Sequence, residues 1–200
     1  MAEDPLHVPI HPVRFVTAAS LFDGHDAAIN IMRRLLQAQG AEVIHLGHDR
    51  SVADVVSAAL QEDVQGIAVS SYQGGHVEYF TYLTERLREV GRSEVRVFGG
   101  GGGVIVPEEI SILAERGVRI FSPQDGQRLG LPGMINTLIR ECDIDHSAGD
   151  VDIEGLAAGS AGALARAITV LQSGRTTPRL QELLATGRSR GVPVLGITGT

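Results

Sequence analysis

Short apolar segments alternate with segments of helical periodicity along the first 142 residues, and this alternation constrains the fold more than any other feature. Strands are predicted at 13–19, 41–46, 66–70, 95–98 and 118–121, and helices at 27–39, 52–62, 77–90, 107–116 and 132–142. In the first helix, apolar residues recur at spacings of three and four, as an amphipathic helix requires. Strands separated by helices predict an α/β protein with a parallel sheet that helices cover on both faces.

Few strand orders are compatible with this alternation, because crossovers between parallel strands are right-handed. We expect the flavodoxin-like five-stranded order 2-1-3-4-5, whose switch point lies between strands 1 and 3. The loops after strands 1, 3 and 4 should then surround one crevice, and open α/β sheets bind their ligands in such a crevice.

These three loops have unusual sequences. The first reads Asp-Gly-His-Asp at 23–26, the second Ser-Ser-Tyr-Gln-Gly-Gly-His at 70–76, and the third is a run of glycines at 99–103. Glycine allows a backbone to pass close to a ligand, because it has no Cβ. The candidate binding residues in the three loops are Asp23, Gly24, His25, Asp26, Ser70, Tyr72, Gly74, Gly75, Gly102 and Gly103.

His25 is the candidate metal ligand of this crevice. A carboxylate that orients the second ring nitrogen often supports a metal-bound histidine, and Asp23 lies two residues before His25. A lone histidine in such a loop is nevertheless more often a surface or helix-capping residue. Asp23 and Asp26 could cap the helix that starts at residue 27, and we expect that role for Asp26. His76 could contact the edge of a ligand in the crevice.

Composition excludes several classes of partner. The net charge of −7 and the pI near 5.4 argue against nucleic-acid binding, which needs a basic surface. No apolar run approaches the length of a membrane span. The single cysteine, Cys142, is compatible with a reducing compartment, so we expect a cytoplasmic protein.

The chain changes character after residue 142. Residues 143–162 are acidic and rich in Gly and Ala, which is typical of a linker, and short helices are predicted at 164–171 and 179–185. Residues 191–200 form an apolar segment that ends in Gly-Thr, like the first strand of a P-loop GTPase domain. The Gly-Lys-Ser/Thr of a P-loop does not follow, so we expect no nucleotide binding by these residues. The expected organisation is a domain at 1–142, a helical linker at 143–190 and a truncated GTPase strand at 191–200.

The three loops together resemble the D-x-H-x-x-G…S-x-L…G-G signature of cobalamin-binding domains of the base-off, His-on type, found in methylmalonyl-CoA mutase and methionine synthase. The residues that carry the resemblance are Asp23 and His25, Ser70, and the glycines before the Val-Ile-Val-Pro at 104–107. Ala28 and Tyr72 depart from the signature, which has Gly and Leu there. The linker and the closing segment resemble the fused isobutyryl-CoA mutases, in which a G-protein chaperone domain and a substrate-binding barrel follow the cobalamin domain.

The resemblance implies a role for each residue. His25 would bind cobalt as the lower axial ligand in place of dimethylbenzimidazole, with Asp23 as its hydrogen-bond partner. The displaced nucleotide tail would lie between strands 1 and 3 against Ser70 and the glycine turns, and Ser122 would close the far side. Adenosylcobalamin would support radical interconversion of isobutyryl-CoA and n-butyryl-CoA in the complete enzyme, a homodimer, whereas these 200 residues alone would catalyse nothing.

Two alternatives come from other functional classes. A cobalamin sensor or a corrinoid methyl-carrier module would use the same fold and the same histidine without catalysing a mutase reaction. A receiver-type signalling domain would share the strand order, but it needs an Asp after strand 3 and a Lys after strand 5. The third strand ends in Ser70, and the chain contains no Lys, so the receiver alternative is poor.

Overall fold

The computed structural model describes residues 5–189, 191–193 and 195–197, and it confirms the predicted sheet. Five parallel strands have the order β2-β1-β3-β4-β5. Their bounds are β1 (Arg14–Ser20), β2 (Glu42–Arg50), β3 (Gly66–Ser70), β4 (Arg96–Gly100) and β5 (Val118–Phe121). All five run in the same direction, so the loops that follow them meet at one edge of the sheet.

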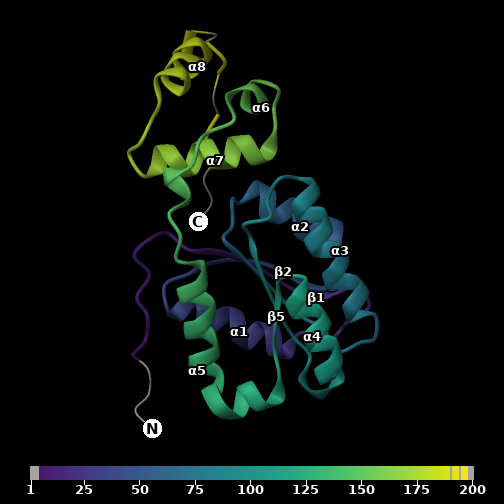
Figure 1. The fold of residues 1–200 in the computed structure, drawn as a ribbon. Coiled ribbons are helices and arrows are strands. Elements are labelled where there is room, and N and C mark those ends of the chain that lie inside the picture. The colour runs from purple at the N-terminus through teal and green to yellow at the C-terminus, as the bar shows by residue number, and fades with distance from the viewer. Residues whose placement is uncertain (1–4, 190, 194, 198–200) are drawn as a thin grey trace. The chain divides into compact units, whose positions relative to one another are not determined.

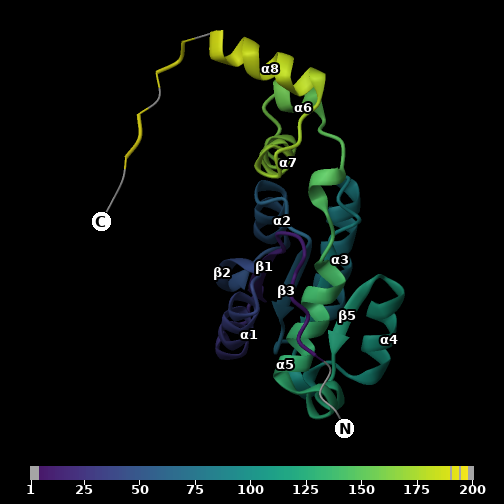
Figure 2. The same cartoon turned by 90° about the vertical axis from the view of Figure 1, so that its left-hand side faces the viewer.

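Helices cover both faces of this sheet, as predicted (Figure 1, Figure 2). They are α1 (Ala27–Ala38), α2 (Val52–Gln61), α3 (His76–Glu89), α4 (Pro107–Glu115) and α5 (Pro123–Cys142). Alternate strand residues point to opposite faces. Phe15 and Phe98 therefore pack with Leu138 against α1 and α5. Val16, Ile67 and Phe80 belong to the second core, which α2, α3 and α4 cover.

Two of the predicted strand ends were wrong, both next to the crevice. β2 continues past residue 46 to Arg50, through irregular pairing with β1 and positive φ angles at Gly47 and Asp49. β4 includes Gly99 and Gly100, so part of the glycine run is strand, and a short 3₁₀ turn, η1 (Gly102–Val104), follows it. Residues 132–142 lie in α5, as predicted. The helix begins earlier, at Pro123, and its first part is separated from the rest by non-helical backbone angles at Gly130.

The described residues from 146 onward belong to a second compact unit, and the described residues up to 145 belong to the first. The second unit contains η2 (His146–Ala148), α6 (Ile153–Ala157), α7 (Ala161–Gln172) and α8 (Pro178–Ser189). The stretch predicted as a linker thus contains helix α6. Both expected short helices are present and are longer than predicted.

The expected GTPase strand at 191–200 lies partly outside the described residues. Residues 191–193 and 195–197, which the structure does describe, have no strand assignment. The truncated GTPase domain and the division of the chain at 142 and 190 stay predictions.

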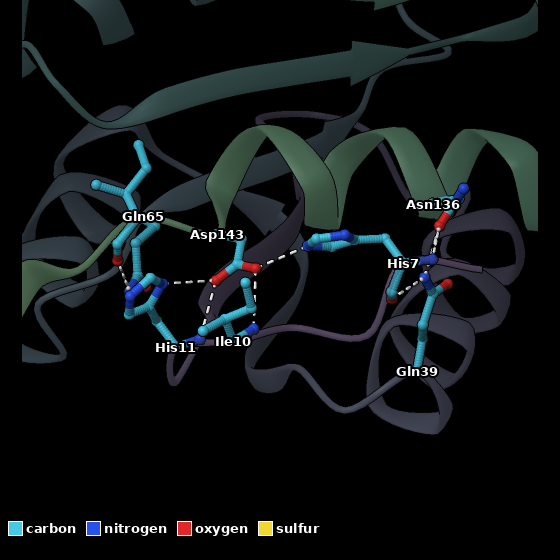
Figure 3. A network of polar contacts seen from close by, with 8 residues as sticks. His7, Ile10, His11, Gln39, Gln65, Asn136 and Asp143 are labelled. Carbon is cyan, nitrogen blue, oxygen red and sulfur yellow. Dashed lines mark hydrogen bonds and ion pairs between the residues drawn. The ribbon is translucent and has the colours of Figure 1, made fainter. Parts of the chain in front are cut away.

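An N-terminal segment, residues 5–12, lies along the sheet domain and is called the strap below (Figure 3). Asp143, which directly follows α5, accepts bonds from the backbone N–H groups of Ile10 (2.9 Å) and His11 (2.9 Å). The imidazoles of His7 and His11 also contact its two oxygens, at 2.7 and 2.9 Å. Burial alone would raise the pKa of Asp143, but these bonds hold it at about 2, below its usual 3.8.

The depressed pKa of Asp143 predicts how its contribution to stability varies with pH. The group adds stability above its unfolded-state pKa, and that stability is lost as the pH falls through the folded-state value. We expect Asp143→Asn to lower the free energy of unfolding by about 1–3 kcal/mol at pH 7. The difference should shrink as the pH falls from about 4 towards 2. Urea denaturation of both proteins across this range measures it, and a difference that stays constant with pH would contradict the assignment.

Candidate functional site

A fully buried carboxyl group, that of Asp23, joins the loops after β1 and β3. Its Oδ1 accepts the backbone N–H of His25 at 2.9 Å and lies 2.8 Å from His25 Nδ1. Its Oδ2 accepts the backbone N–H of Tyr72 at 2.6 Å. Asp23 therefore places the candidate ligand and the second loop relative to each other, as the crevice prediction required.

The His25 ring is held at one nitrogen and open at the other. The Nδ1 contact to Asp23 favours the tautomer with a proton on Nδ1, which leaves the lone pair of Nε2 available to a metal. The side chain is 66% exposed, so an incoming ligand can reach it. The Tyr72 ring lies beside it, with ring centroids 5.8 Å apart. Tyr72 thus borders the histidine at the crevice.

Asp49, at the end of β2, supports this loop and was not found from the sequence. Its carboxylate accepts the backbone N–H of Phe22 at 2.8 Å, and its own N–H donates to the Asp23 carbonyl at 3.2 Å. Both Phe22 and Asp49 have positive φ angles, which are uncommon for residues with a Cβ. The sequence predicts that the second strand ends at residue 46, which makes Asp49 an ordinary loop aspartate. Nothing in the sequence indicates that it supports the loop after β1.

The glycine run passes very close to the end of β3. A Cβ on Gly101 would lie 1.9 Å from the backbone oxygen of Ser71, so only glycine fits there. Gly102 has a φ of +58° and would place a Cβ 3.3 Å from the Tyr72 ring. A Cβ on Gly103 would meet no atom of the described residues within 4 Å. Glycine is therefore required for steric or backbone reasons at positions 101 and 102. The sequence instead predicted Gly102 and Gly103 as the glycine pair of the binding site.

Ser70 ends β3 on the face that α1 and α5 cover. It lines a narrow cleft of about 60 Å³ together with apolar residues of the sheet and both helices, among them Ile29, Phe98 and Leu138. The Ser70 hydroxyl is buried and has no hydrogen-bond partner among the residues that the structure describes. Buried polar groups without partners are rare, and this one faces a cleft, so it is a candidate hydrogen-bond partner for a ligand.

The structure places other predicted residues away from this cleft. Gly74 and Gly75 line a separate hollow of about 520 Å³ on the opposite face, with Tyr79 of α3. Ser122 borders a third hollow of about 380 Å³ with Gly103. The Ser122 hydroxyl caps α5 by bonding Asp125, and this bond lowers the pKa of Asp125.

Two further residues have structural roles that differ from those expected. Asp26 occupies the N-cap position of α1, as expected, but within the described chain its side chain makes no capping bond. His76 is buried rather than at the crevice surface. Its Nε2 lies 2.7 Å from Glu109 of α4, and this bond lowers the pKa of Glu109.

Comparison with known proteins shows the family to which the chain is similar. The family model "B12 binding domain" matches residues 13–125. The chain is 67% identical over its whole length to a fused isobutyryl-CoA mutase of Nocardia farcinica. It is 62% identical, over 96% of its length, to one of Cupriavidus metallidurans. It spans about a fifth of each relative, 19% and 18%. These matches confirm the resemblance that the loop motifs predicted.

A solved structure has the same fold. A cobalamin-binding protein from Desulfitobacterium hafniense DCB-2 superimposes with a TM-score of 0.54 over 65% of this chain and 59% of its own. At 23% sequence identity, this similarity supports the fold assignment and nothing finer.

The glycine contacts predict different effects of the same substitution at neighbouring positions. Gly101→Ala should lower the free energy of unfolding by more than about 3 kcal/mol, because a Cβ there overlaps the backbone of Ser71. Gly103→Ala is the matched control and should change it by less than about 0.5 kcal/mol. Urea denaturation of both variants measures this. Equal effects would mean that the glycine run is not packed against β3 in this way.

Proposed function

The chain belongs to the family of B12-binding domains, and from that premise we propose that it binds adenosylcobalamin with His25 as the lower axial ligand of cobalt. The observation that carries the proposal is the Asp23–His25 pair at the carboxyl edge of the sheet, with Nδ1 engaged and the ring exposed. Neutral imidazole is a common metal ligand, and a carboxylate partner raises its basicity.

The lining of the cleft between α1 and α5 has the polarity that the nucleotide tail of the cofactor requires. Its walls are apolar, as an aromatic base requires, and the unpartnered Ser70 hydroxyl supplies one hydrogen bond in an otherwise apolar site. Ligand pockets commonly combine an apolar lining with a few placed polar groups. Gly100 also lines this cleft, so the tail would lie against bare backbone at the end of β4.

The complete protein is proposed to be an acyl-CoA mutase that interconverts isobutyryl-CoA and n-butyryl-CoA. The relatives that share 62–67% identity are named fused isobutyryl-CoA mutases. Bound adenosylcobalamin would supply the radical chemistry of carbon-skeleton rearrangement. This chain would bind and orient the cofactor, while a substrate-binding barrel and a G-protein chaperone domain would provide the acyl-CoA site and the loading function. We also propose that the full protein is a homodimer.

The proposed location is the cytoplasm. Among the described residues, no helix is both long and apolar enough to cross a membrane. The cellular location itself stays a prediction based on the single cysteine and the absence of a long apolar run.

An absorbance titration with adenosylcobalamin tests the proposal. The wild type should bind saturably with a His-on spectrum. His25→Ala should lose that spectrum and bind at least about tenfold more weakly, since it removes the cobalt ligand. His48→Ala is the matched control, because His48 is an exposed histidine of β2, and it should bind like the wild type. Binding by His25→Ala with an unchanged spectrum would overturn the assignment of the ligand.

A further inference from the structure

We propose that the strap, residues 5–12, positions helices α1 and α5 and thereby sets the fit of the cleft for the nucleotide tail. The inference rests on the proposed function, since it concerns how the cleft takes the tail. Through His7, the strap contacts Gln39, just beyond the end of α1, and Asn136 in α5, both away from His25. They act on the cofactor site through the two helices, so they are positioning residues.

The cleft is too narrow for a nucleotide in the arrangement described. It measures about 60 Å³, whereas sites for ligands of drug size measure about 300–1,000 Å³. The sheet wall is fixed by the ladder of β1, β3 and β4. The cleft can therefore widen where α1 and α5 move apart, and contacts between these helices decide how far.

Towards His25, each of the two helices lacks one restraint that a regular, capped helix would have. The Asp26 side chain does not cap α1 among the described residues, so the helix start lacks that restraint. α5 is interrupted at Gly130, with a φ of 62° and a ψ of 172°, just before Met134, which lines the cleft. Breaks of this kind are sites where helices bend.

The same helices are tied together further along α5 by buried polar contacts. The Oδ1 of Asn136, a residue only 3% exposed, accepts from Gln39 Nε2 at 2.9 Å and from the backbone N–H of His7 at 2.6 Å. Gln39 Nε2 also donates to the His7 carbonyl at 2.9 Å. Three separate segments therefore meet at one amide oxygen (Figure 3).

Asp143 holds the strap in place for these contacts. Figure 3 shows the His7 and His11 rings reaching its carboxylate from opposite sides. The Asp143 side chain is only 5% exposed, so its bonds are shielded from water. Helix α5 thus has two attachments to the strap, at Asn136 and just beyond its end at Asp143.

This arrangement gives the cleft a fixed end and a free end. The cleft would open by a larger separation of α1 and α5 near His25 than at the strap. The strap would keep the distance between the two helices constant at its own end. Loss of the tie would leave α1 and α5 joined at that end only by the apolar contacts of their shared core, such as Leu36 with Ile135 and Ile139. The cleft would then be less preorganised for the tail. Preorganised sites bind more tightly because less ordering is needed on binding.

Two corrinoids separate this effect from general loss of structure. Aquacobalamin carries the nucleotide tail, and aquacobinamide lacks it but still offers cobalt to His25. Gln39→Ala removes the amide that links the helices and the strap. Gln61→Ala is the matched control: it removes a glutamine at the end of α2, on the other face of the sheet, whose amide bonds Ser57.

We expect Gln39→Ala to weaken aquacobalamin binding about tenfold in an absorbance titration of the 200-residue chain. Its binding of aquacobinamide should stay within about twofold of wild type, and Gln61→Ala should change neither. An equal loss for both corrinoids, or no loss for aquacobalamin, would overturn the role of the strap. If the wild type bound neither corrinoid, the proposed function itself would fail, and this inference with it.

Discussion

The carboxyl group of Asp23 is completely buried, and a buried carboxyl group is costly unless its oxygens receive hydrogen bonds. The chain meets this requirement with the backbone N–H groups of His25 and Tyr72 and with the His25 ring. One side chain thus ties the loop after β1 to the loop after β3 and orients the proposed cobalt ligand. Asp49 reinforces the first of these loops from β2, so the crevice is braced from three neighbouring strands.

The sheet topology explains why these loops can meet. In the order β2-β1-β3-β4-β5, helices α1 and α5 lie on one face and leave a cleft between them that ends at Ser70. The approach of Gly101 to Ser71 brings the loop after β4 to the same place. The strap adds the last element, since it joins α1 to α5 through Asn136 and so links the N-terminal residues to the proposed nucleotide site.

Much of this could be predicted from the sequence. The strand order followed from the alternation of apolar and helical segments, and Asp23, His25 and Ser70 followed from their positions at strand ends. The start of α5 could not be predicted, because Gly130 and Pro132 look like a loop although they interrupt a helix. Asp49, Asn136 and Gln39 were missed for a common reason. Their roles arise from contacts between segments far apart in the chain, and no local pattern encodes such contacts.

The central claim is that a protein nitrogen replaces the dimethylbenzimidazole nitrogen on cobalt. Electron paramagnetic resonance of the cobalt(II) form of cobalamin, bound to the chain labelled with ¹⁵N-histidine, tests it most directly. A ¹⁵N ligand has nuclear spin one-half and splits each cobalt line into a doublet. The account predicts that doublet for the labelled wild-type chain. The unlabelled wild-type chain, whose His25 contains ¹⁴N, should give a triplet instead. A triplet that persists in the labelled protein would mean that the cofactor keeps its own base, and it would contradict the account.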